Sequence, residues 1–262
     1  MSTLGALKDP EIWLLPEDEV DGLTEQAHAV LSSDEHARWA RLRTEAARRR
    51  HLGARLLCRS VLGAYAGAPP DQFRFRKGHF GRPELDPNPW RLRFNLSHTD
   101  GLIACVVTDG LPCGIDVERL LVAPSVVRFG VERLAPAERA RLDAAPPAVR
   151  SREFVDVWVL KEAYTKALGS GFQYGFDSFQ LGPDSRRGVL LEDPRQPEHD
   201  AVCWQFALST TSTGHRLAVA VRRREHTSRA MPMPLKLFPS GDLLCSLPAY
   251  SEPPPSAACP VD

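Results

Sequence analysis

Two acidic residues in a strand-like segment are the first groups in this sequence with the chemistry of a site. Asp116 and Glu118 lie in the segment "CGIDVERL" (113–120), which follows the turn sequence "TDGLP" and is typical of a β-strand. Side chains two positions apart on a strand point to the same face. Two carboxylates on one face repel each other unless a cation lies between them. The pair alone fits either a solvated strand edge or part of a cation site.

A second group of charged residues lies in the helical segment "WVLKEAYTKALGSG" (158–171). Glu162 and Lys166 are four positions apart, and an exposed helical pair of this kind contributes only about 0.3 kcal/mol. Apolar residues around them favour a buried helix instead, namely Phe154, Trp158, Ala163 and Leu168. We therefore predict that Lys161, Glu162 and Lys166 share the face beside this core and form the wall of a site.

Together these segments supply three hard oxygen donors, from Asp116, Glu118 and Glu162. Such carboxylates suit Mg²⁺ or Mn²⁺, with water and a substrate phosphate completing the coordination. The cysteines and histidines do not have the spacing of a zinc site. The sequence therefore predicts a divalent-cation site in the second half of the chain.

The first half of the chain carries positive charge that complements this acidic group. Arginines gather in "RLRTEAARRR" (41–50), and "RKGHFGRPEL" (76–85) adds more basic residues in a turn with two glycines. We expect most of these side chains to be solvated and a few beside a cleft to hold phosphates. The segment "FNLSHTDG" (94–101) places Ser97 and His98 where a strand ends, so His98 is either a structural residue or a ligand contact.

Composition limits the classes of partner. The chain has 262 residues, with 33 Lys plus Arg and 33 Asp plus Glu, so its overall charge gives no reason to expect a nucleic-acid or membrane partner. The longest uncharged apolar run, "LIACVV" (102–107), is too short to cross a bilayer, and the N-terminal segment lacks the features of a signal peptide. None of the six cysteines forms a C-x-x-C pair. We expect reduced thiols and a soluble, cytoplasmic protein.

The sequence repeats itself weakly at an offset of about 102 residues, as an internal duplication would produce. The segment "RHLGARLLCRSVLGAYAG" (50–67) aligns with "REFVDVWVLKEAYTKALG" (152–169), and "LSSDEHARWARL" (31–42) aligns with "LAPAERARLDAA" (134–145). Chance similarity between amphipathic helices is the alternative. The order of the segments favours an α+β fold of two related lobes, residues 1–111 and 112–225, each with helices packed on a small antiparallel sheet.

The acidic residues occur only in the second copy of this repeat. In the alignment Glu162 replaces Ser60, Lys166 replaces Ala64, and Asp116 replaces an apolar residue. Burying carboxylates costs several kcal/mol unless they are neutralised, so these exchanges indicate chemistry and not packing. The remaining residues, 226–262, are rich in proline, and we expect an irregular or partly disordered tail in which "LKLFPSGDLL" can dock on the body. We also expect its deletion to leave activity largely in place.

Four motifs, taken in order and spacing, resemble a known family. The segments "GRPEL", "FNLSHTDG", "GIDVE" and "WVLKEAYTKALGSGF" resemble the surfactin-synthetase-activating class of 4′-phosphopantetheinyl transferases, over roughly residues 30–180. That family has a pseudo-duplicated α+β fold. The resemblance implies transfer of 4′-phosphopantetheine from coenzyme A to a serine of an apo acyl or peptidyl carrier protein, with adenosine 3′,5′-bisphosphate as the other product.

The resemblance also implies roles for individual residues. Asp116, Glu118 and Glu162 would hold Mg²⁺, or Mn²⁺ in its place, at the pyrophosphate of coenzyme A. Glu162 would also help to deprotonate the carrier serine, and Lys166 would neutralise the pyrophosphate. Asp116, Glu162 and Lys166 are thus the expected catalytic residues. Coenzyme A contacts are expected from Arg41, Lys77, Arg82, Ser97, His98 and Lys166; Arg82 stands where the family usually has lysine.

Two other functions are compatible with the sequence. A Mg²⁺-dependent nucleotide pyrophosphohydrolase would need the cation and the arginines but no protein acceptor. A non-catalytic scaffold that binds carrier proteins would not need the three carboxylates.

Because a duplicated chain can form its cleft within one molecule, we expect a monomer.

Overall fold

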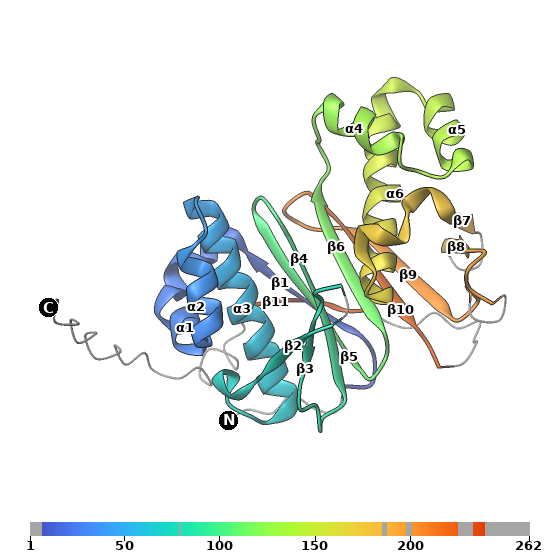
Figure 1. Ribbon diagram of the computed structural model, residues 1–262. Coiled ribbons are helices and arrows are strands. Elements are labelled where there is room, and N and C mark those ends of the chain that lie inside the picture. The colour runs from blue at the N-terminus through green and yellow to red at the C-terminus, as the bar shows by residue number, and fades with distance from the viewer. Residues whose placement is uncertain (1–6, 79, 185–187, 198–200, 225–232, 239–262) are drawn as a thin grey trace, which may run out of the picture.

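The computed structural model describes residues 7–78, 80–184, 188–197, 201–224 and 233–238. Two β-sheets form the centre of the molecule, and one long helix covers the outer side of each sheet (Figure 1). The chain passes from the first sheet to the second between Asp109 and Cys113. This α+β arrangement of two lobes is the predicted fold class.

The first lobe begins with a strand, continues through helices and ends in strands. Its elements are β1 (Glu11–Pro16), η1 (Glu17–Leu23), α1 (Thr24–Val30), α2 (Ser33–Ala40), α3 (Glu45–Ala66), η2 (Pro70–Gln72), β2 (Phe75–Lys77), β3 (Pro83–Leu85), β4 (Leu92–Thr99) and β5 (Leu102–Asp109). The Ser32 hydroxyl and the Glu35 carboxylate form a capping box at the start of α2. Helix α3 ends at Gly67, whose φ of 63° is the left-handed conformation that glycine adopts most readily.

The second lobe repeats this order. Its elements are β6 (Cys113–Arg119), α4 (Pro124–Val131), α5 (Pro136–Ala144), α6 (Pro147–Leu168), η3 (Gly171–Tyr174), η4 (Phe176–Ser178), β7 (Gln180–Asp184), β8 (Gly188–Glu192), β9 (Trp204–Thr210) and β10 (His215–Arg222). A last strand, β11 (Leu235–Leu237), returns to the first lobe. The strand orders are β11-β1-β5-β4 in the first sheet and β6-β10-β9 in the second.

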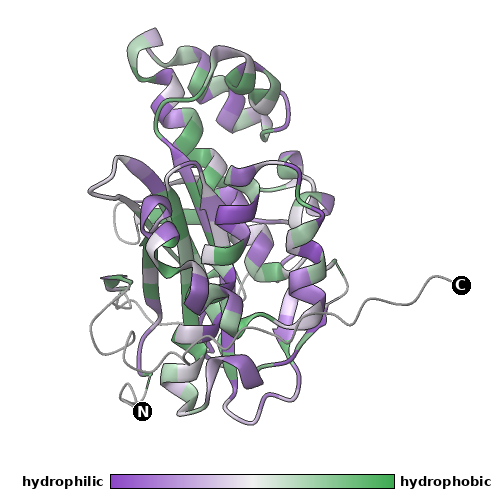
Figure 2. Cartoon of the chain, turned by 90° about the vertical axis from the view of Figure 1, so that its left-hand side faces the viewer, coloured by the Kyte–Doolittle hydropathy of each residue, from purple (hydrophilic) through white to green (hydrophobic). Residues whose placement is uncertain are grey.

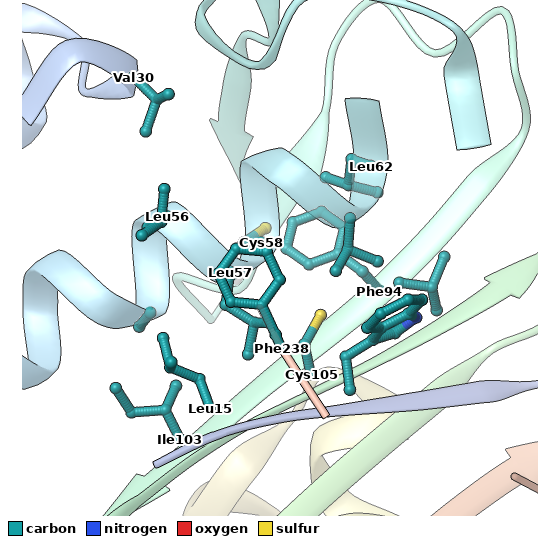
Figure 3. Close-up of a cluster of buried hydrophobic side chains, with 14 of the residues drawn as sticks. Leu15, Val30, Leu56, Leu57, Cys58, Leu62, Phe94, Ile103, Cys105 and Phe238 are labelled. Atoms are coloured by element: carbon teal, nitrogen blue, oxygen red, sulfur yellow. The ribbon is translucent and has the colours of Figure 1, made fainter. Parts of the chain in front are cut away.

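Three apolar cores hold these layers together. The first lies between α3 and the first sheet (Figure 3), and the second lies between α6 and the second sheet. The third joins the two sheets through alternate residues of β1, β5, β6 and β10, including Val106, Ile115 and Val219. Figure 2 views the molecule from the side on which α1, α2 and α3 lie. The strands behind these helices are largely hydrophobic. Because residues 113, 115 and 117 of β6 point into the third core, Asp116 and Glu118 must face α6.

The first lobe contains a buried ion pair between its short and long helices. The Arg59 guanidinium of α3 lies 2.7 Å from the carboxylate of Glu35, which also completes the capping box of α2. It donates further hydrogen bonds to the carbonyls of Pro70 and Phe73. This one buried cation therefore connects α2, α3 and the loop that follows α3.

The second lobe has the same device at the aligned positions. The Lys161 ammonium of α6 lies 2.9 Å from the Glu138 carboxylate near the start of α5, and it donates to the carbonyls of Phe176 and Phe179. The sequence repeat aligns Glu35 with Glu138 and places Lys161 opposite the arginine of the first lobe. The correspondence of these buried pairs supports the internal duplication.

Lys161 does not share the site-facing side of α6, so that expectation was wrong. Its side chain is fully buried on the far side of the helix, whereas Glu162 and Lys166 face β6. Consecutive residues of an α-helix differ in direction by about 100°, so Lys161 and Glu162 point to different neighbours. The apolar surroundings of the segment were compatible with either side.

The C-terminal segment contributes to the first lobe. Strand β11 pairs in parallel with β1, and Phe238, only 1% exposed, lies in the first core (Figure 3). Docking of "LKLF" on the body is thus confirmed, whereas the expectation of an irregular segment is wrong for residues 235–237. Residues 225–232 and 239–262 lie outside the described residues.

Two further expectations concern membranes and thiols. Within the described part of the chain, no helix has both the length and the hydrophobicity needed to cross a bilayer. Cys58, Cys105 and Cys113 are free thiols, and all three are buried, as is Cys203. The other two cysteines, Cys245 and Cys259, lie in the part that the structure does not describe.

His51 should make the protein sensitive to acid. Burial, followed by the positive charges of Arg55 and Arg38, lowers the pKa of His51 to about 4 from 6.5. The unfolded chain therefore binds this proton more tightly, and the stability contributed by neutral His51 is present above pH 6.5 and lost as the pH falls towards 4. The loss amounts to about 2–3 kcal/mol between pH 7 and 4.5. Chemical unfolding at pH 7 and 4.5 measures the free energy of unfolding, and its change between these pH values should be smaller in His51→Leu than in the wild type. An equal change in both proteins would contradict this prediction.

Candidate functional site

The neighbouring edge strands β4 and β6 are joined by side chains. The Asn95 amide oxygen accepts a hydrogen bond from the backbone N–H of Ile115 at 3.0 Å, and the Ser97 hydroxyl accepts one from that of Val117 at 3.4 Å. Two residues further along β4, the Thr99 hydroxyl donates to the Glu118 carboxylate at 3.1 Å. We call this region, residues 94–100 of the first lobe and 113–119 of the second, the β4–β6 junction. It holds the two motif strands side by side.

Gly114 allows α6 to lie directly on β6. A Cβ atom at this position would be 2.0 Å from the carbonyl oxygen of Ala163 and 2.5 Å from the backbone nitrogen of Ala167. Only glycine permits this approach, which brings the helix carrying Glu162 and Lys166 against the strand carrying the acidic pair. The glycine of "GIDVE" therefore positions the site without entering its chemistry.

Substitution of this glycine should separate the helix from the strand. We expect Gly114→Ala to lower the free energy of unfolding by about 2–3 kcal/mol, because the clash is with backbone atoms that cannot rotate away. Denaturant titration measures the loss. Gly182→Ala is the matched control, since a Cβ there meets no atom of the described residues within 4 Å. Equal effects of the two substitutions would show that the contact at Gly114 is unimportant.

Asp116 is the centre of the site. It is 4% exposed, and its Oδ1 atom accepts from the Ser97 hydroxyl at 2.8 Å and from the Lys166 ammonium at 2.5 Å. Lys166 also donates to the Ser97 hydroxyl at 3.1 Å. Lys166 is therefore paired with Asp116 across the contact between β6 and α6. This ion pair between two elements takes the place of the pair within the helix, between Lys166 and Glu162, that the spacing alone would suggest.

Glu162 and Glu118 lie close enough to Asp116 for their charges to interact. Burial, then the charge of Asp116, raises the pKa of Glu162 to about 7, while Lys166 opposes the shift. Burial and then Asp116 also raise the pKa of Glu118. Three carboxylates from β6 and α6 thus share one partly enclosed region, where the charge of Asp116 disfavours the ionisation of both Glu118 and Glu162.

This donor set fits a divalent cation. The Oδ2 atom of Asp116 is buried and has no hydrogen-bond partner among the described residues, which is costly unless something else satisfies it. A bound cation would satisfy that oxygen and offset the repulsion from Glu118 and Glu162. In the described residues, however, no group of three or more acidic, histidine or cysteine side chains already stands in a metal-binding arrangement. The Lys166 ammonium, which holds Oδ1 of Asp116, would have to share that carboxylate with the cation.

The expected coenzyme A contacts lie at different distances from this centre. Ser97 contacts both Asp116 and Lys166. His98 follows on β4 with its side chain exposed, and partial desolvation followed by the charges of Arg50 and Lys166 lowers its pKa. In its uncharged form, the imidazole has one donor and one acceptor nitrogen to offer a ligand.

Arg41 and Lys77 are both exposed, at the end of α2 and of β2. The Nε atom of Arg41 donates to the carbonyl of Ala37 in its own helix. Neither residue has a described contact with the acidic group, so their assignment as coenzyme A contacts still depends on the resemblance.

Arg82 is directed at backbone carbonyls. Its guanidinium donates to Lys166 at 2.8 Å, Ala167 at 3.1 Å, Phe94 at 2.9 Å and Cys113 at 3.0 Å. The side chain thus reaches from the β2–β3 hairpin to α6, β4 and β6. Position in the "GRPEL" motif gave no sign of this.

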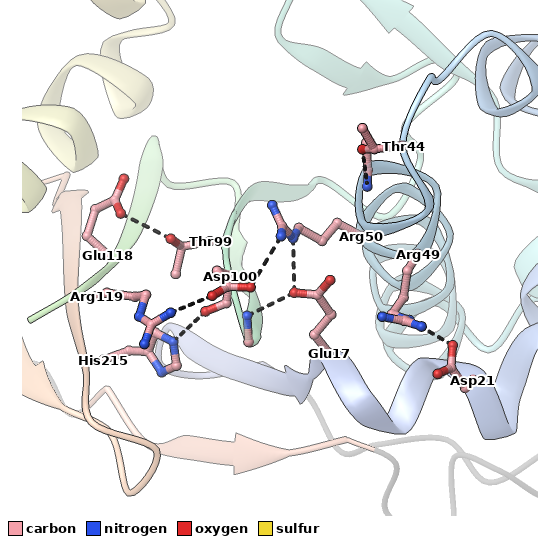
Figure 4. Close-up of polar contacts among 12 residues, drawn as sticks. Glu17, Asp21, Thr44, Arg49, Arg50, Thr99, Asp100, Glu118, Arg119 and His215 are labelled. Atoms are coloured by element: carbon pink, nitrogen blue, oxygen red, sulfur yellow. Dashed lines mark hydrogen bonds and ion pairs between the residues drawn. The ribbon is translucent and has the colours of Figure 1, made fainter. Parts of the chain in front are cut away.

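A polar network lies where strands β4 and β6 end, and the sequence patterns did not predict it (Figure 4). Arg50 of α3 binds the buried Glu17 at 2.9 Å and contacts Asp100 at 3.4 Å, while Arg119 binds the second oxygen of Asp100 at 2.5 Å. Glu17 also accepts from the backbone N–H of Gly101. Asp100 thereby links the lobes. Asp100 comes directly after strand β4 and Arg119 is the last residue of strand β6, and these positions were the available signal.

The two-lobed α+β fold and an acidic site where the lobes meet define a class of protein that sequence comparison identifies. The model of the 4′-phosphopantetheinyl transferase superfamily matches residues 112–221, and that of the 4′-phosphopantetheinyl transferase N-terminal region matches residues 21–109. The chain belongs to the 4′-phosphopantetheinyl transferase family. The two matches meet at the boundary between the lobes.

Individual relatives agree with this membership. The chain is 35% identical to the 4′-phosphopantetheinyl transferase HetI of Nostoc sp., over 61% of this chain and 68% of that protein. It is 28% identical to a 4′-phosphopantetheinyl transferase of Bacillus subtilis, over 67% of this chain and 78% of that protein. A crystal structure of a holo-(acyl-carrier-protein) synthase from Bacillus anthracis in complex with CoA matches 45% of this chain and 98% of its own, at 23% identity and a TM-score of 0.37.

Proposed function

We propose that this protein transfers the 4′-phosphopantetheine group of coenzyme A to a serine hydroxyl of an apo acyl or peptidyl carrier protein. Family membership supports the reaction. The observation that carries the assignment of residues is the Asp116–Lys166 contact of 2.5 Å between strand and helix, because it brings the two motifs into one site. Adenosine 3′,5′-bisphosphate is the second product.

The carboxylates provide the seat for a cation. Asp116, Glu118 and Glu162 would hold Mg²⁺, or Mn²⁺ in its place, which when bound offsets negative charge on the pyrophosphate of coenzyme A. The buried, unpartnered Oδ2 of Asp116 supports this assignment. Ser97 and Lys166 keep the same carboxylate oriented through its other oxygen.

Glu162 and Lys166 have complementary roles in the transfer. Glu162 accepts the proton of the carrier serine, directly or through a water molecule, as the serine oxygen attacks the phosphorus bound to the pantetheine arm. The phosphoanhydride bond breaks, and the bond electrons go to the phosphate oxygen of the departing adenosine bisphosphate. Lys166 lies beside Asp116, where its ammonium can stabilise the charge on that pyrophosphate.

Arg41, Lys77, Ser97 and His98 would bind the remainder of coenzyme A. Their positions on α2, β2 and β4 give the first lobe the binding role and leave the proton transfer to the second lobe. In this proposal the protein acts as a monomer in the cytoplasm, and its two lobes, residues 1–111 and 112–225, form one cleft.

Intact-mass spectrometry of the carrier tests this function. The protein would be incubated with coenzyme A, Mg²⁺ and each of a panel of apo carrier proteins from fatty-acid, polyketide and nonribosomal-peptide systems. We expect one carrier to gain the mass of a single phosphopantetheine. Carrier-independent cleavage of coenzyme A would indicate a pyrophosphohydrolase instead, and carrier binding without a mass change would indicate a scaffold.

His98 should act mainly in binding coenzyme A. Replacing it with alanine removes a ring near the charges of Arg50 and Lys166 but leaves Asp116 and Glu162 in place. We expect the KM for coenzyme A to rise about tenfold, the equivalent of roughly 1.4 kcal/mol, with kcat changed less than threefold. Steady-state kinetics with a saturating carrier separates the two constants. An unchanged KM would remove His98 from the binding residues.

A further inference from the structure

The guanidinium of Arg82 uses its terminal donors on the protein itself. Nη1 donates to the carbonyls of Lys166 and Ala167, and Nη2 donates to the carbonyls of Phe94 and Cys113. A guanidinium has two N–H groups on each of these nitrogens, so all four are engaged. Only the Nε–H group is left for another partner. A single donor cannot form the bidentate contact through which arginine usually binds a phosphate.

The acceptors of Arg82 belong to the three elements that carry the site. Phe94 lies in β4, three residues before Ser97, and Cys113 lies in β6, three residues before Asp116. Lys166 is itself a site residue, and Arg82 holds its backbone carbonyl while its ammonium contacts Asp116. One side chain therefore fixes the spacing between both strands and the helix.

The end of α6 also favours such a partner, in addition to the backbone N–H of Gly169, which donates to the carbonyl of Lys166 at 3.0 Å. The last four carbonyls of an α-helix have no acceptor role within the helix, and they carry partial negative charge. The carbonyls of Lys166 and Ala167 belong to this group, since α6 ends at Leu168 with Gly169 following in the left-handed conformation. A positive group with several donors satisfies them both electrostatically and geometrically.

We propose that Arg82 is a positioning residue that joins β4, β6 and the end of α6, so that Lys166 reaches Asp116 and Ser97, and that it is not a coenzyme A contact. This inference rests on the proposed function for its kinetic readout. Lysine could not replace it fully, because an ammonium has three donors at a single point whereas the four carbonyls lie on three separate elements.

The kinetic test compares two identical substitutions in one hairpin. Arg82→Lys should lower kcat at least tenfold and change the KM for coenzyme A by a smaller factor, because Lys166 loses its alignment with Asp116 whereas Arg82 itself makes no contact with the ligand. Arg76→Lys is the matched control, since Arg76 lies in the same hairpin and makes an exposed ion pair with Glu84. We expect the control to match the wild type in both constants. A rise in KM of tenfold or more with unchanged kcat in Arg82→Lys, or no change in either constant, would overturn the proposal.

A second measurement needs neither activity nor a stable variant. In the wild-type protein without coenzyme A, nitrogen-15 NMR should show the four Nη protons of Arg82 as separate, slowly exchanging signals, because four hydrogen bonds hinder rotation of the guanidinium. These signals should persist with little change when coenzyme A is added. Averaged signals that separate only on addition of coenzyme A would show a ligand contact and overturn the proposal. Since no transfer is measured, this outcome is independent of whether the proposed reaction is correct.

Discussion

Replacing Glu162 with glutamine should lower kcat for carrier modification by about 10³-fold, within the range expected for loss of a general base. Glutamine has nearly the same shape, so the packing of α6 on β6 should persist while the negative charge and the proton acceptor are lost. Without a bound cation, burial and the charge of Asp116 raise the pKa of this carboxylate to about 7, which suits proton transfer near neutral pH. Steady-state kinetics would measure the loss, and circular dichroism with thermal unfolding would verify the fold.

Glu153→Gln is the control for that experiment. Glu153 lies on the same helix, α6, but lines a cavity with Arg141 and Asp156, away from the three carboxylates. We expect its kcat to remain within twofold of the wild type. If Glu162→Gln retained more than a tenth of the wild-type activity, the carboxylate would not act as the base.

Replacing Phe238 with alanine should destabilise the first lobe by about 3 kcal/mol, the usual cost of removing a fully buried phenylalanine ring. Phe238 lies in the same core as Leu57 and Cys105, and its backbone N–H donates to the carbonyl of Leu14 (Figure 3). Removal of the ring leaves a cavity between β1 and α3. Urea unfolding monitored by tryptophan fluorescence would give the loss, because Trp13 belongs to this core.

The neighbouring residue provides an internal control. Leu237 lies on the same strand and is 63% exposed, so Leu237→Ala should change stability by less than about 0.5 kcal/mol. Deletion of residues 226–262, which we expected to leave activity largely in place, removes β11 and Phe238 together, so we now expect that deletion to destabilise the first lobe. Equal stability of both variants and the wild type would mean that the segment does not dock in solution.

The two periodicities of the sequence predicted most of the acidic site. Alternation on a strand placed Asp116 and Glu118 on one face, and helical spacing placed Glu162 and Lys166 on another, and both predictions hold in the structure. The partner of Lys166 was beyond this reasoning, because Asp116 lies 50 positions away and approaches only through the contact that Gly114 allows. Periodicity describes one element at a time.

The duplication was predictable from the aligned helices. Only the structure shows that the aligned cations, Arg59 and Lys161, form equivalent buried ion pairs. A charged residue in an apolar helix fits equally well a site wall or a buried ion pair, which is why Lys161 was misplaced. The role of Arg82 and the strand β11 share a different cause. Both depend on acceptors or partners distant in sequence, the carbonyls of three elements and the free edge of β1, and backbone groups leave no trace in residue type.

The most direct measurement of the central claim is anomalous diffraction from crystals of the protein grown with coenzyme A and Mn²⁺. We expect one strong anomalous peak in contact with the carboxylates of Asp116 and Glu162 and with the pyrophosphate, and its loss in crystals of Asp116→Asn. A peak bound elsewhere, or coenzyme A in the cleft with its pyrophosphate far from both carboxylates, would contradict the account.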